Sequence, residues 1–232
     1  MIQPAKPQPT PESSDAPPRV VSRARAVRLA RPLSLCLCDF DPLYAHAVAS
    51  WVRDEKELLW LAPRTLSPLS APKVMAWQRP GGNRMLLWDA SSATPIGYGE
   101  LNEMPNEPGH LWIGHFVIAP HFRGRGLGRR FVHALLCRGF QDLGARLVSL
   151  VVFPENQFAI RCYEQNALQA TGREIKYVKE SRMRHEFVRM AISLPQFERL
   201  IGCGELPLRS ILYIDDGAML RRGPVRLPTI SG

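Results

Sequence analysis

Arginine and glycine alternate in one short segment, Arg123–Arg130, which reads Arg-Gly-Arg-Gly-Leu-Gly-Arg-Arg. An apolar run at 111–119 precedes it and an apolar-periodic segment at 131–143 follows it, as in a strand, a turn and a helix. Such a turn aims several backbone N–H groups at one point, where the helix N-terminus adds roughly half a positive charge. Because arginines at a helix start are unfavourable unless an anion compensates them, the segment predicts a polyanion site, most simply for a diphosphate.

The spacing of the glycines excludes two common diphosphate-binding loops. A nucleoside-triphosphate loop ends in Gly-Lys-Ser/Thr, and this segment has neither the lysine nor the hydroxyl. A dinucleotide-binding turn is Gly-x-Gly-x-x-Gly tight against its strand, whereas Arg129 stands where the third glycine belongs. The segment therefore indicates a diphosphate ligand of another kind.

A second set of polar residues follows the apolar run 147–153. Asn156, Ala159 and Tyr163 are spaced so that they share one face of a helix, and the small residue in the middle permits close approach of a thin ligand. Taken alone, Asn156 could be a helix cap and Tyr163 a half-buried core residue.

Both segments match the signatures of one family. The string Val117–Gly128 resembles the acetyl-CoA loop of the GNAT N-acetyltransferase superfamily, in which Arg/Gln-x-x-Gly-x-Gly/Ala follows a strand end. Asn156-x-x-Ala159-x-x-x-Tyr163 resembles the second signature of that family. Where many members continue with Gly-Phe, this chain has Ala167 and Leu168, which puts the geometry of that turn in doubt and leaves the fold intact.

The resemblance implies transfer of the acetyl group of acetyl-CoA to a primary amine of a small molecule or a protein, by direct attack in a ternary complex. It implies no metal. A backbone N–H within 116–118 would stabilise the charge that develops on the carbonyl oxygen, and Tyr163 would protonate the leaving thiolate. The implied cofactor-binding residues are Phe116, Val117, Ile118, Arg123, Gly124, Arg125, Gly126, Leu127, Gly128, Arg129, Asn156, Ala159 and Tyr163.

The general base is left open. Some family members carry a glutamate where this chain has Val151, which cannot accept a proton. Glu100 lies on one strand face with Tyr98 and Asn102, so it could accept the proton or hold the substrate ammonium, and Asn102 could hold a water. His115 is suited to the task because an ordinary imidazole titrates near neutrality; a satisfied, partly buried histidine is the alternative. The catalytic candidates are therefore Tyr163, His115 and Glu100.

These residues need a particular set of elements to bring them together. The sequence predicts strands at 33–38, 84–88, 96–101, 111–118, 147–153, 170–178 and 187–194. It also predicts four helices: one that begins at Asp41, one at 55–61, one that follows the glycine-rich turn and ends near Gly144, and one at 157–166. Residues 62–80 contain four prolines and are predicted to be a loop, in which Trp77 could cover a groove. This order matches the GNAT order and implies an α/β (α+β) fold: a mixed, mostly antiparallel sheet of six or seven strands flanked by helices, with a V-shaped split between its two central parallel strands.

Composition divides the chain into three parts. Residues 1–33 are rich in proline and arginine and are expected to form a disordered leader. Residues 34–194 form the predicted acetyltransferase domain, and 195–232 form an extension of unknown role in which 211–214 could add a strand.

Apolar runs, cysteines and net charge indicate where the protein acts and what it binds. No run approaches the roughly 18 apolar residues of a membrane span, and five cysteines without metal-ligand spacing indicate free thiols and a cytoplasmic protein. The net charge of +9 keeps a nucleic-acid-binding module as a distant alternative, since no RNA-reading or zinc-finger motif accompanies it. Val151 keeps a non-catalytic acyl-CoA-binding regulatory domain as the nearer one. The expected partner is an amine acceptor, which Glu103 and Glu107 could attract, and a homodimer is one option for assembly.

Overall fold

The computed structural model describes residues 33–202 and 212–214. The predicted leader, apart from Leu33, and most of the predicted extension lie outside the described residues. The strands are β1 (Leu35–Asp39), β2 (Asn83–Asp89), β3 (Thr94–Glu103), β4 (His110–Ile118), β5 (Leu147–Val152), β6 (Gln169–Val178), β7 (Met183–Ser193) and β8 (Leu212–Ile214). The helices are η1 (Pro42–Tyr44), α1 (Ala45–Ser50), α2 (Glu55–Leu61), α3 (Ala71–Met75), η2 (Pro120–Phe122), α4 (Leu127–Cys137), the π-helical turn η3 (Arg138–Asp142), α5 (Gln157–Glu164) and α6 (Leu194–Gly202).

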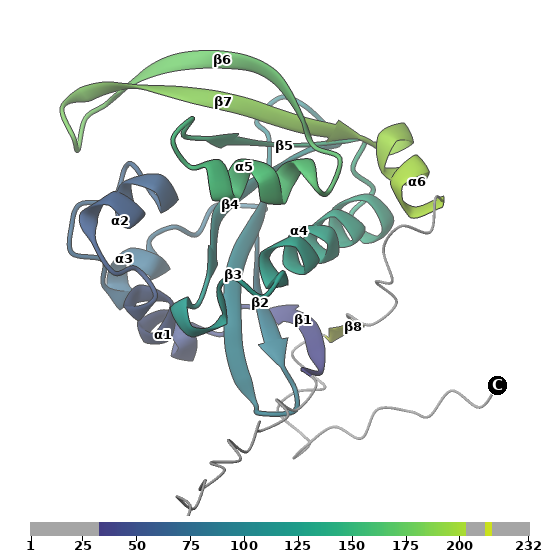
Figure 1. Ribbon diagram of the computed structural model, residues 1–232, viewed down its shortest axis with the longest axis horizontal. Helices are drawn as coiled ribbons and strands as arrows, with labels where there is room; N and C mark the ends of the chain where they lie inside the picture. The colour runs from purple at the N-terminus through teal and green to yellow at the C-terminus, as the bar shows by residue number, and fades with distance from the viewer. Residues whose placement is uncertain (1–32, 203–211, 215–232) are drawn as a thin grey trace, which may run out of the picture. The chain divides into compact units, whose positions relative to one another are not determined.

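The strands form one sheet in the order β6-β7-β5-β4-β3-β2-β1-β8 (Figure 1). Neighbouring strands are antiparallel except for the pairs β4–β5 and β1–β8, which are parallel. The predicted mixed, mostly antiparallel sheet is therefore confirmed. The described part of the chain has eight strands rather than six or seven, because β8 pairs with the outer edge of β1, Leu212 lying opposite Cys36.

The two central parallel strands separate after a short paired stretch. β4 and β5 pair only from His110 to Trp112 and from Leu147 to Ser149. Beyond that point β4 runs on to Ile118 and β5 to Val152 without pairing to each other. This divergence confirms the predicted V-shaped split, and it opens a gap in the sheet at the carboxyl ends of both strands.

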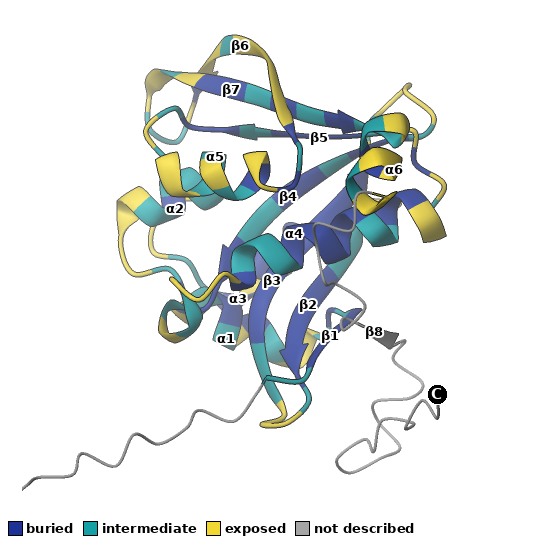
Figure 2. Ribbon diagram, turned by 45° about the vertical axis from the view of Figure 1, so that its right-hand side comes forward, coloured by how far each residue is buried: buried dark blue, intermediate teal, exposed yellow. Residues whose placement is uncertain are grey.

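Helices cover both faces of the sheet, and the alternation of the strand residues builds a separate core on each side. Leu35 and Leu37 belong to the core that packs under α4, α5 and α6. Cys36 and Cys38 belong to the core under α1, α2 and α3. Figure 2 shows that β2 and β3 are buried along most of their length, whereas β6 at the sheet edge is exposed.

Three element boundaries differ from the prediction. The proline-rich loop contains α3, because Pro72 lies in its first turn, where a missing N–H costs nothing. β7 begins at Met183 rather than 187, since polar residues such as Glu186 stand on the exposed hairpin and pair across it with Arg173. The packed region continues past residue 194 into α6, where Phe197 stacks on Phe140 with ring centroids 4.7 Å apart. Within the described ranges, none of the helices has the length and apolar character needed to cross a bilayer.

Candidate functional site

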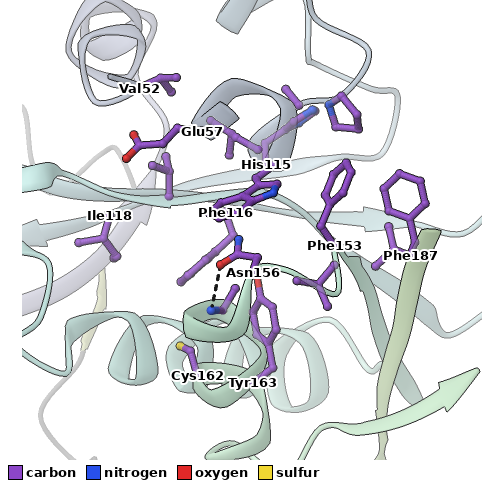
Figure 3. Close-up of a pocket in the computed structure, with 18 of the residues that line it drawn as sticks. Val52, Glu57, His115, Phe116, Ile118, Phe153, Asn156, Cys162, Tyr163 and Phe187 are labelled. Carbon is purple, nitrogen blue, oxygen red and sulfur yellow. Dashed lines mark hydrogen bonds between the residues drawn. The ribbon is translucent and has the colours of Figure 1, made fainter. Parts of the chain in front are cut away.

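A cavity of about 1150 Å³ opens where β4 and β5 diverge (Figure 3). Its walls come from the turn before α4, from α2 and α5, from the segment around α3, and from the β6–β7 hairpin. Eleven of the thirteen predicted cofactor-binding residues line it; the other two are Arg125 and Arg129. Arg125 instead lies over the ring of Phe122 at 5.7 Å, and the Nε of Arg129 is buried without a hydrogen-bond partner among the described residues.

The turn before α4 has the geometry of an anion cradle. Gly124 and Gly126 have φ angles of 74° and 72°, in the left-handed region that favours glycine. No atom lies within 4 Å of the position that a Cβ would take at either glycine, so a side chain there would extend into open space rather than into the protein. The first turn of α4 contains no acidic residue. The backbone and charge of this turn therefore fit the diphosphate of coenzyme A.

Gly128 serves a different purpose. A Cβ at this position would lie 3.3 Å from the Sγ of Cys162, on α5. The absence of a side chain thus lets α4 approach α5 closely, and this contact closes one end of the cavity.

The side chain of Arg123 makes three hydrogen bonds within the protein. Its Nε donates to the carbonyl of Ile118 at 2.8 Å, its Nη1 to Glu57 Oε1 at 2.7 Å and its Nη2 to the carbonyl of Trp51 at 2.9 Å. These contacts link the turn before α4 to the end of β4 and to α2. The side chain also lines the cavity, so contact between Arg123 and the cofactor stays a prediction.

Glu57 is the counterpart of this link. Although partial burial opposes its charge, hydrogen bonds from Arg53 and Arg123 lower the pKa of Glu57 to about 2. The carboxylate therefore stays ionised and occupied by two guanidinium groups.

A β-bulge places His115 at the cavity. The register of β3 and β4 passes from Tyr98 opposite Val117 to Glu100 opposite Gly114, so two residues of β4 face one of β3. His115 lies in this bulge with a φ of 41°, a left-handed conformation that is strained for histidine. Strain of this kind persists only where surrounding contacts hold the residue in place.

Those contacts come from a buried carboxylate. The Nδ1 of His115 lies 2.9 Å from Oε1 of Glu100. Glu100 is fully buried and also accepts hydrogen bonds from the Tyr98 hydroxyl at 2.6 Å and from Asn102 Nδ2 at 3.0 Å. Burial opposes the charge of Glu100, but the contacts with His115, Tyr98 and Asn102 lower its pKa below the ordinary value. Glu100 thus remains an anion behind His115 and does not line the cavity, so it is not placed to touch a substrate.

Trp77 holds the other side of the imidazole. Its ring stacks on His115 with centroids 4.2 Å apart and an interplanar angle of 11°. The indole Nε1 donates to Thr65 Oγ1 at 2.9 Å, which fixes the ring in turn. The sequence placed Trp77 near a groove but carried no signal for this stacking, because 38 residues separate the two rings along the chain.

The predicted residues of α5 gather on the cavity side of that helix. Asn156 Oδ1 accepts a hydrogen bond from the backbone N–H of Ala159 at 3.2 Å and so caps α5, while also lining the cavity (Figure 3). Tyr163 packs edge-on against Phe116, with ring centroids 6.2 Å apart. Burial raises the pKa of Tyr163, so its hydroxyl keeps its proton at neutral pH.

The acidic residues expected near the acceptor lie elsewhere. Val151 lines the cavity where relatives can have a glutamate, whereas Glu103 and Glu107 lie outside the lining. Glu107 instead contacts Nδ1 of His110 at 2.6 Å, and Nε2 of that histidine lies 2.7 Å from Ser149 Oγ. This serine–histidine–carboxylate row is not placed to attack a substrate, because Ser149 is only 2% exposed and lies outside the cavity lining. Across the described residues, no cluster of His, Cys, Asp and Glu could hold a metal ion.

Known proteins are similar to this chain in sequence and in fold. A family model described as "Acetyltransferase (GNAT) family" matches residues 45–167. Over 67 residues the chain is 31% identical to the probable spermine N(1)-acetyltransferase of Bacillus subtilis subsp. natto strain BEST195 and 30% identical to the spermine/spermidine N(1)-acetyltransferase of B. subtilis strain 168. Each match covers 29% of this chain and 44% of the relative, so the chain spans less than half the length of these curated relatives.

Solved structures extend the similarity to most of the chain. The crystal structure of the Vibrio cholerae spermidine N-acetyltransferase in complex with CoA and spermine matches with a TM-score of 0.61 at 18% identity, over 71% of this chain and 98% of that one. The aminoglycoside acetyltransferase AAC(6')-Ib in complex with coenzyme A and kanamycin matches with a TM-score of 0.55 at 23% identity, over 72% and 98%. At these identities the likeness establishes the fold. Because the family model covers more than half of the 232 residues, this chain belongs to the acetyltransferase (GNAT) family.

Proposed function

We propose that the protein is an N-acetyltransferase that uses acetyl-CoA to acetylate a primary amine of a small molecule. The observation that carries this proposal is that the glycine cradle and the imidazole of His115 open into the same cavity. The curated relatives are named as acetyltransferases of spermine and spermidine, which supports amine acetylation as the reaction class.

The cradle would hold the cofactor through its backbone. Backbone amides between Gly124 and Gly128 would bind the diphosphate of coenzyme A. Asn156 and Ala159 would lie along the chain of the cofactor that leads from the diphosphate to the sulfur. Acetyl-CoA supplies the acetyl group as a thioester, which an amine can attack. The bulge at His115 and Phe116 interrupts the pairing of β4, which supports a backbone N–H from this stretch as the donor to the carbonyl oxygen.

His115 is the general base in this proposal. A lysine-like amine has a pKa of about 10.4 and arrives protonated, so it must lose a proton before it can attack. Because Nδ1 lies 2.9 Å from the Glu100 carboxylate, Nε2 is the nitrogen that would accept that proton. The anionic Glu100 keeps the Nδ1–H tautomer and stabilises the imidazolium, so Glu100 acts through His115 as a positioning residue.

The proton balance closes with Tyr163. A bond forms between the amine nitrogen and the carbonyl carbon, and the carbon–sulfur bond breaks. The ammonium loses two protons in all: His115 passes the first to solvent, and the second leaves the nitrogen as the new bond forms. The Tyr163 hydroxyl protonates the departing thiolate and recovers a proton from the product nitrogen, directly or through water, so one proton is released in each turnover.

The second candidate function is a non-catalytic acyl-CoA-binding regulatory domain, which the valine at position 151 favours. Release of free thiol from acetyl-CoA with a panel of amines separates the two, combined with calorimetric titration of acetyl-CoA into wild type and His115→Ala. If the protein is an enzyme, the turnover rate should be at least 100-fold lower in His115→Ala than in wild type, with unchanged affinity for acetyl-CoA. Tight binding without turnover would favour the regulatory domain, and no binding would refute both.

A further inference from the structure

The cavity is lined by more positive than negative charge. Its basic side chains are Arg53, Arg64, Arg79, Arg123, Lys176 and Arg189, and its acidic ones are Glu57 and Glu155. Glu57 is already paired, because its Oε1 accepts from the side chains of Arg53 and Arg123 and its Oε2 from the backbone N–H of Arg53. Glu155 is exposed at the start of α5 and is the one carboxylate of the described lining that remains.

Four of the basic residues lie away from the diphosphate cradle. Arg64 and Arg79 flank α3, and Lys176 and Arg189 lie on the β6–β7 hairpin, so none of them belongs to the glycine turn or to α5. Lys176 and Arg189 share a single carboxylate, Glu174, at 2.7 and 3.1 Å. The lining contributed by these two segments therefore keeps an excess of positive charge after the ion pairs with Glu174 are counted.

Arg79 is the member of this group that lies nearest in sequence to Trp77, the residue stacked on His115. Arg79 follows Trp77 by two residues. The Cα atoms of Trp77 and Arg79 therefore lie within about 7 Å of each other. The Arg79 guanidinium lies over the ring of Trp112 at 5.1 Å, and among the described residues no carboxylate pairs with it. A guanidinium without a carboxylate partner keeps N–H groups available for a two-point contact with an oxyanion.

We propose that the acceptor is a small primary amine that also carries an oxyanion, a carboxylate or a phosphate, and that Arg79 binds this group beside His115. This inference rests on the proposed acetyltransferase function and narrows its substrate class. A polyamine such as spermine would bring its additional ammonium groups close to these basic side chains, where like charges repel. The acceptor class named for the curated relatives is therefore not expected here.

Matched acceptor pairs test this proposal with the full chain at saturating acetyl-CoA. In the pairs β-alanine against propane-1,3-diamine and phosphoethanolamine against ethanolamine, we expect kcat/KM to be at least ten-fold higher for the anionic member, and the two pairs distinguish carboxylate from phosphate. Arg79→Gln should lower kcat/KM for the preferred anionic amine by about 10- to 100-fold, mainly through KM, with unchanged acetyl-CoA affinity. Arg184→Gln, an exposed arginine outside the cavity lining, is the control and should match wild type.

Equal or higher kcat/KM for spermidine and the diamines, or an Arg79→Gln variant that keeps full activity on anionic amines, would overturn this inference and leave the acetyltransferase function standing. Binding of acetyl-CoA without thiol release for any amine would overturn both.

Discussion

Replacing Glu100 by Gln tests the proton pathway while keeping the volume of a fully buried side chain. The carboxylate has three close contacts, at 2.6 Å to the Tyr98 hydroxyl, 3.0 Å to Asn102 Nδ2 and 2.9 Å to His115 Nδ1. An amide NH₂ must face at least one of these donors, and a buried donor left unpaired costs about 1–3 kcal/mol. The variant also loses the charge that stabilises an imidazolium at His115. Because general base catalysis contributes a rate factor of about 10² to 10⁴, we expect kcat to decrease by a factor in that range.

The assay measures thiol release at saturating acetyl-CoA, with calorimetric cofactor affinity and thermal unfolding recorded on the same samples. Because Glu100 lies outside the cavity lining, acetyl-CoA affinity should change less than two-fold while kcat falls. Glu103→Gln is the matched control, since Glu103 is an exposed carboxylate at the end of the same strand and outside the cavity. A folded Glu100→Gln protein with wild-type kcat would refute the coupling between Glu100 and His115.

Three further perturbations test other parts of the site. Gly126→Glu should weaken acetyl-CoA binding at least ten-fold in calorimetry, because a charged side chain would extend into the cradle. The control is Gly144→Glu, since Gly144 has the same left-handed backbone at φ 67° but lies outside the cavity, and this variant should bind acetyl-CoA normally. Equal losses of affinity in both variants would contradict the assignment of the cradle. Tyr163→Phe should lower kcat about 10- to 100-fold with unchanged cofactor affinity, and an unaltered rate would exclude Tyr163 as the acid. Glu57→Gln should lower the free energy of unfolding by about 1 kcal/mol at neutral pH, since two arginines lose a charged partner. Because the pKa of Glu57 is lowered from 4.5 to about 2, this stabilisation is present above pH 4.5 and lost as the pH falls toward 2; a pH-independent difference in denaturant unfolding would contradict it.

The sequence predicted the parts of the site that are local in the chain. The cradle depends on glycines two residues apart, and the α5 residues depend on helical spacing, so both patterns are visible without tertiary structure. The fold was predicted because the order of strands and helices resembles that of the GNAT family. The helix α3 was missed because its proline occupies a first turn, where composition alone indicates a loop.

The direction of the charged side chains could not be predicted, because it depends on distant partners. Nothing in the sequence indicated that the guanidinium of Arg123 contacts Glu57 and Trp51, which lie 66 and 72 residues earlier in the chain. Strand alternation placed Glu100 and His115 among the candidates as rivals for one role. Only the bulge in β4 shows that one lies behind the other.

A crystal structure with a non-hydrolysable acetyl-CoA analogue tests the central claim most directly. The account predicts diphosphate oxygens at hydrogen-bond distance, about 2.7–3.2 Å, from backbone amides between Gly124 and Gly128, with the acetyl group beside the imidazole of His115. A diphosphate bound away from this turn, or an acetyl group out of reach of His115, would contradict it.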